Sequence, residues 1–128
     1  KNEMAAQEQA AKINEQVGRQ VVFLVPTSQA LTALRTMIYN KQIPGLDKQA
    51  ELFADNIGHP TAPLQVLNAY LHYAVIYGRS PVGLPIPSAL KNAGKPQWNN
   101  EAFNRALAEL AWTTVINYPP SGVKAAAQ

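Results

Sequence analysis

Apolar residues recur at helical spacing in four stretches of the chain, and each stretch is followed by a signal that ends a helix. The first stretch covers residues 2–18, with Gly18 as its stop. The second begins at Thr27 or Ser28 and ends before the Ile-Pro-Gly turn at residues 43–45. We therefore expect two helices in the first third of the chain.

Two further helices are predicted in the second half. A strongly apolar stretch opens at Pro60 or Thr61 and runs to Tyr77, and Gly78 is placed to end it. It has almost no polar face, so we expect this helix to be largely buried and its tyrosines to pack in the core. The last helix is predicted over residues 100–117.

One segment has the character of a strand. Residues Val21 to Val25 form a continuous apolar run, rich in β-branched side chains, that ends at Pro26. Such a run is typical of a strand covered on both faces in a parallel sheet. A single buried strand cannot satisfy its own backbone hydrogen bonds. Either this run pairs with strands outside the chain, or it is not a strand.

Composition is that of a folded domain or a piece of a larger one. The 128 residues are 47% hydrophobic and only 15% charged, so the chain can bury a core. No cysteine is present, which excludes disulfides and thiolate metal sites. No apolar run approaches the roughly 20 residues of a membrane span. Residues 1–11 lack the apolar core of a signal peptide, so any export signal is expected upstream of this chain.

The positive charge does not point to nucleic acid. The net charge is +3, but the eleven lysines and arginines are scattered along the sequence and form no run or stripe. Proteins that bind nucleic acid usually gather such charges on one face. We therefore expect no nucleic-acid partner.

A short polar loop carries the most informative chemistry. It places Asp55 and His59 between two apolar elements, just before a predicted helix. Asp55 can accept the Nδ1 proton of His59, which fixes the tautomer and stabilises the imidazolium. The Nε2 atom is then free to take a proton from a nucleophile. The alternative is that Asp55 is a turn residue and His59 a residue of the helix start.

The flanking sequence favours the catalytic alternative. Residues 55–60, 70–85, 110–112 and 118–123 together resemble the C-terminal block of SGNH (GDSL-like) hydrolases. The resemblance is to bacterial members in which an Asp-x-x-His loop precedes a helix that ends in a Gly-x-Ser-Pro turn. It covers the chain from about residue 10 to residue 123.

The resemblance implies an α/β fold, a three-layer α/β/α sandwich with a parallel sheet. Residues 1–123 would form the C-terminal segment of that domain, mostly helical, with Val21 to Val25 as the last sheet strand. Residues 124–128 are expected to be a disordered tail.

The resemblance also implies an ester hydrolase with a Ser-His-Asp triad and no cofactor. His59 would be the general base and Asp55 its supporting acid, acting on a small ester or an acylated carbohydrate. The serine of the family lies in a Gly-Asp-Ser block, and none of the four serines here lies in such a block: Ser28, Ser80, Ser88 and Ser121. We expect a missing N-terminal portion to supply the nucleophile and the oxyanion donors, and this chain alone to be inactive.

The spacing of the pair departs from the family pattern. Three residues separate Asp55 from His59, so Asn56 occupies the Asp-x-x-His register. Either the loop bulges by one residue and Asp55 supports His59, or an amide has replaced the acid. We favour the bulge, because Gly58 offers backbone freedom.

His72 is the second histidine of the chain, and it bears on whether a metal site is present. His72 lies in the apolar helix and is expected to be a satisfied core or interface histidine. It is thirteen residues from His59 with no carboxylate pair between them, so we expect no metal site. The alternative to a hydrolase is a non-catalytic structural or interaction module derived from the same fold.

Overall fold

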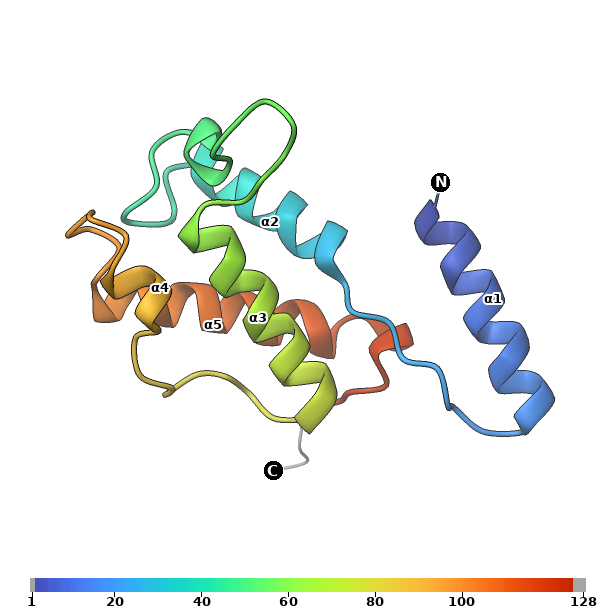
Figure 1. Cartoon of the computed structure of the whole chain (residues 1–128). Coiled ribbons are helices and arrows are strands. Elements are labelled where there is room, and N and C mark those ends of the chain that lie inside the picture. Colours follow the sequence, from blue (N-terminus) through green and yellow to red (C-terminus); the bar gives the residue numbers. More distant parts are fainter. Residues whose placement is uncertain (1, 126–128) are drawn as a thin grey trace.

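Three helices pack together and enclose the core of the chain (Figure 1): α2 (Thr27–Tyr39), α3 (Ala62–Tyr77) and α5 (Glu101–Ile116). The computed structural model describes residues 2–125. The most extensive contact between two elements is that of α3 with α5. Aliphatic side chains fill this contact, and those fully buried include Leu67 and Leu71 of α3 and Leu107 and Val115 of α5. Leu34 of α2 is fully buried in the same core.

Local signals set the ends of these helices. Gly78 ends α3 in the left-handed conformation, with φ +61°, and its N–H donates to the carbonyl of Ala74. Asn100 caps α5, because its Oδ1 accepts the N–H of Phe103 at 3.1 Å. Three short elements were not predicted: η1 (Gln49–Leu52) between α2 and α3, α4 (Ser88–Lys91) between α3 and α5, and η2 (Pro119–Ser121) after α5.

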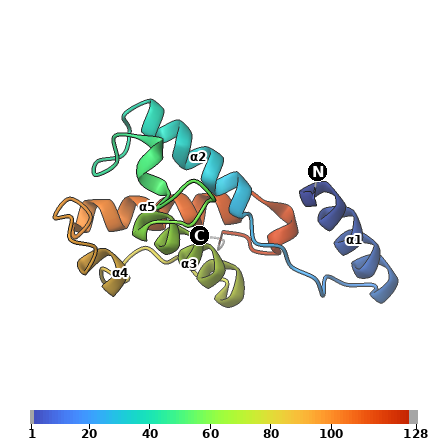
Figure 2. The same cartoon turned by 45° about the horizontal axis from the view of Figure 1, so that its top comes forward.

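The predicted α/β sandwich is wrong, because residues 2–125 form helices and no sheet. Val21 to Val25 is an extended connection instead of a strand, and Figure 2 shows it crossing from α1 to α2. The carboxamide of Asn14 accepts the N–H groups of Val21 and Val22 at 2.8 and 2.9 Å. The N–H of Leu24 donates to the carbonyl of Pro120 at 2.9 Å. A side chain and a loop carbonyl thus take the place of a neighbouring strand.

Helix α1 (Asn2–Val17) lies to one side of the three-helix body in both views (Figures 1 and 2). Besides the Asn14 contacts, the amide of Gln7 donates to the hydroxyl of Tyr118 at 2.9 Å. Of its apolar side chains only Ala10 is buried, whereas Met4, Ile13 and Val17 are exposed. Polar contacts therefore hold α1 more than apolar packing does.

The C-terminal end of α3 is less covered than its sequence predicted. Ile76 and Tyr77 are 68% and 65% exposed. The expectation that Tyr77 packs in the core is therefore wrong, whereas Tyr70 is buried as expected. The last turn of α3 therefore leaves apolar side chains at the surface.

Candidate functional site

The loop that carries Asp55 and His59 is closed at its base. Phe53 and Pro60 form an isolated antiparallel bridge, and the N–H of Ala54 donates to the carbonyl of His59 at 2.7 Å. These bonds join the two arms of the loop immediately before α3. These contacts hold the loop as a surface turn and fix the backbone from which the side chains of Asp55 and His59 extend.

The carboxylate of Asp55 binds both the side chain and the backbone of the loop. Its Oδ1 accepts the N–H of Ile57 at 3.0 Å and that of His59 at 3.2 Å. Its Oδ2 forms a short hydrogen bond with Nδ1 of His59. An ionised carboxylate only accepts, so Nδ1 is the donor, and in the neutral imidazole Nε2 is then the acceptor. Of the two arrangements that the sequence left open, the structure has the bulged loop, with Asp55 and not Asn56 against the imidazole.

Hydrogen bonding sets the charge state of this carboxylate. The side chain of His59 lowers the pKa of Asp55 from its ordinary value, and the backbone N–H of His59 lowers it further. Asp55 is therefore ionised at neutral pH. The two side chains are 68% exposed for His59 and 39% exposed for Asp55, so a group from another polypeptide segment can reach the imidazole.

The structure brings no serine to this pair. The Oγ of Ser80 accepts the N–H of Val82 at 3.1 Å, within the turn after α3. The Oγ of Ser121 is buried, donates to the carbonyl of Val115 at 2.9 Å and accepts the N–H of Val123. Both hydroxyls have structural roles. Among the described residues, no serine is hydrogen-bonded to His59.

His72 is exposed, so it is not a core histidine. Its Nδ1 lies 2.8 Å from the carbonyl of Asn68 in the preceding turn of α3. This contact is with its own helix and joins no second element. Nowhere in residues 2–125 do three carboxylate, histidine or cysteine side chains gather as a metal site requires.

A cleft of about 540 Å³ adjoins the loop. Arg35 of α2 lies along it, with its guanidinium carbon 5.6 Å from the centroid of the Phe53 ring. Asp55, Asn56 and Gly58 line its other side. The sequence pattern did not indicate Arg35, because the arginine is twenty residues before Asp55 and on another helix.

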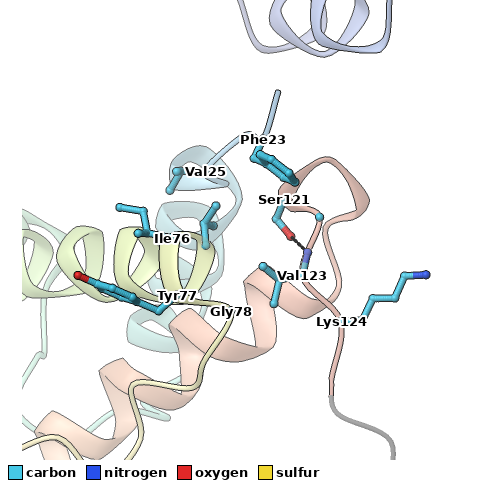
Figure 3. Close-up of a pocket in the computed structure, with 10 residues that line it drawn as sticks. Phe23, Val25, Ile76, Tyr77, Gly78, Ser121, Val123 and Lys124 are labelled. Carbon is cyan, nitrogen blue, oxygen red and sulfur yellow. Dashed lines mark hydrogen bonds between the residues drawn. The ribbon is translucent and has the colours of Figure 1, made fainter. Parts of the chain in front are cut away.

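A second, larger cleft of about 670 Å³ lies near the C-terminal end of α3 (Figure 3). Phe23 and Val25 of the extended connection, Ile76 and Tyr77 of α3, and Val123 line it. The sixteen residues of α3 span about 24 Å between this end and the His59 loop. The sequence pattern did not predict this cleft, because the apolar residues that line it were expected to be buried.

Comparisons with known proteins add no relative: no family model, no curated protein and no solved structure matches this chain. Within residues 2–125, none of the helices has both the length and the apolar character needed to cross a membrane.

Proposed function

We propose that this chain supplies the general base and its supporting carboxylate to a serine ester hydrolase of the SGNH type. The observation that carries this function is the hydrogen bond between Nδ1 of His59 and Oδ2 of Asp55. From the resemblance we take only the roles of these two residues, not the three-layer sandwich. The serine and the oxyanion donors come from another polypeptide segment, expected N-terminal to this chain.

The two residues would act in the order that their geometry allows. As the serine Oγ bonds to the ester carbonyl carbon, Nε2 of His59 takes the hydroxyl proton. The Asp55 carboxylate stabilises the imidazolium that forms. Collapse of the tetrahedral intermediate breaks the bond to the alcohol oxygen, which receives the proton from Nε2. Water then attacks the acyl-serine by the same proton transfers and releases the acid.

The exposure of the pair agrees with a nucleophile that arrives from outside the chain. A complete triad would hide the Nε2 edge of the imidazole under the segment that carries the serine. Here the imidazole is 68% exposed, and within residues 2–125 its one side-chain partner is Asp55. The substrate would be a small ester or an acylated carbohydrate.

Hydrolysis of p-nitrophenyl acetate by the complete polypeptide that contains this chain tests the function. We expect His59→Ala to lower kcat/KM by about 10³-fold or more. The matched control is His72→Ala, which removes an exposed imidazole bonded only to its own helix and should leave kcat/KM unchanged. Equal rates for His59→Ala and the wild type would exclude His59 as the base.

A second candidate function is an interaction module without catalysis, with a second copy of the chain as the partner. The exposed apolar side chains of the larger cleft favour it, since Phe23, Ile76 and Tyr77 are each at least half exposed. In that case Ile76→Arg should convert dimers to monomers in light scattering. Met4→Arg, at an equally exposed position of α1, should not. A wild-type chain that is monomeric at all concentrations would contradict this function.

A further inference from the structure

Arg35 is a charged side chain whose hydrogen-bonding groups are unused within residues 2–125. No carboxylate there lies within 4.0 Å of its guanidinium, and none of its N–H groups has a hydrogen-bond acceptor there. The ring of Phe53 lies under the guanidinium at 5.6 Å. A cation over an aromatic face is held in place while its edge N–H groups stay free.

Asp55 is the one acidic residue that lines the cleft in front of Arg35. Its ionised carboxylate binds His59 and two backbone N–H groups and forms no ion pair with Arg35. The remaining lining residues are uncharged. The charge of Asp55 thus stays in the cleft, but the N–H groups of Arg35 have no partner within residues 2–125.

The space beside the catalytic loop is open enough for a ligand. No atom lies within 4 Å of the position that a Cβ on Gly58 would take. The cleft volume of about 540 Å³ is within the range of small-molecule sites. A molecule bound by Arg35 would thus lie against the same loop that carries Asp55 and His59.

We propose that this cleft binds a carboxylate group of the substrate, and that Arg35 selects esters that carry such a group. The planar guanidinium presents paired N–H groups at the spacing of two carboxylate oxygens. His59 does not line the cleft but follows Gly58, which does, so the ester bond would have to extend past Gly58 to reach the imidazole. The identity of the substrate class rests on the proposed function, whereas binding of the anion does not.

The test is an NMR titration of this chain with monomethyl succinate, a carboxylate-bearing ester, and with the neutral dimethyl succinate. We expect monomethyl succinate to shift the backbone amides of Ala54, Asn56 and Gly58 in a saturable manner. Arg35→Gln should raise its Kd by about fivefold or more, and Arg35→Lys should restore only part of the loss. The control is Arg79→Gln, an exposed arginine outside the cleft, which should leave Kd unchanged.

Two results would overturn the anion site: an unchanged Kd in Arg35→Gln, or equal binding of the two succinate esters. Binding of monomethyl succinate and ester hydrolysis, each measured for His59→Ala as well, together separate the anion site from the catalytic proposal. Arg35-dependent binding together with hydrolysis that is independent of His59 would refute the hydrolase and leave the anion site. Hydrolysis that requires His59, together with binding that ignores Arg35, would refute the anion site alone.

Discussion

The hydroxyl of Tyr70 on α3 donates a 2.6 Å hydrogen bond to Oδ1 of Asn104 on α5. Both side chains are buried. The Nδ2 of Asn104 in turn donates to the carbonyl of Leu84 at 3.0 Å. One asparagine therefore joins the two helices of the main contact to the proline-rich loop between them, inside a largely apolar core.

Tyr70→Phe should destabilise the fold, because it leaves the buried Oδ1 of Asn104 without a donor. The expected loss is about 1–3 kcal/mol in the free energy of unfolding, measured by urea denaturation. Tyr39→Phe removes a hydroxyl from a side chain that is 80% exposed and should change nothing. Equal midpoints for Tyr70→Phe and the wild type would show that this bond contributes no net stability.

The Tyr70 hydroxyl makes the free energy of unfolding depend on pH in the alkaline range. Burial raises the pKa of Tyr70 above its ordinary value. The unfolded chain then loses this proton at lower pH than the folded chain. Its contribution is fully present below the ordinary tyrosine pKa and is lost as pH rises through the folded pKa. Urea denaturation from pH 8 to 12 should show a steeper fall for the wild type than for Tyr70→Phe.

Helices were predictable because their signals are local. Gly78 ends α3 through its own backbone conformation, and Asn100 caps α5 through a bond three residues away. The secondary structure of Val21 to Val25 could not be predicted from local signals in the same way. Whether Val21 to Val25 forms a strand depends on what lies beside it, and the structure places the Asn14 side chain and the Pro120 carbonyl there.

The candidate site was likewise predictable only where its contacts are local in sequence. Asp55 and His59 are four residues apart, so the contact between them could be inferred from a short loop. The cleft beside them also needs Arg35 and Phe53, which meet only when α2 packs near the loop. The hydrophobic pattern also failed at Tyr77, because apolar residues on a helix do not show whether another element covers them.

Gly45 is needed for its conformation and for space. Its φ is +96°, and a Cβ there would lie 2.9 Å from a ring carbon of Phe103, which is fully buried. Gly94 has φ +78° with open space around it. Gly94→Ala should cost about 1–2 kcal/mol from backbone strain alone. Gly45→Ala should cost clearly more in the same urea experiment, and equal losses would show that the Phe103 ring moves freely.

Asn14 should control how firmly α1 is held. Its carboxamide bonds the backbone of both Val21 and Val22. Asn14→Ala removes these bonds, so the segment around Gly18 should be cleaved about three- to tenfold faster by a protease under native conditions. Gln9→Ala, on the same helix, is the control. Unchanged cleavage in Asn14→Ala would mean that other contacts hold α1.

The charge on Asp55 gives a direct test of the pair at the candidate site. His59 donates to this carboxylate and lowers its pKa, so His59→Ala should raise that pKa toward its ordinary value. The stability that the pair contributes is present above the unfolded pKa of Asp55, and is lost as pH falls through the folded pKa. Carboxyl ¹³C shifts of Asp55 followed from pH 7 to 2 measure both forms. Asn56→Ala and His72→Ala should titrate like the wild type, and a shift as large in Asn56→Ala would transfer the supporting role to the amide.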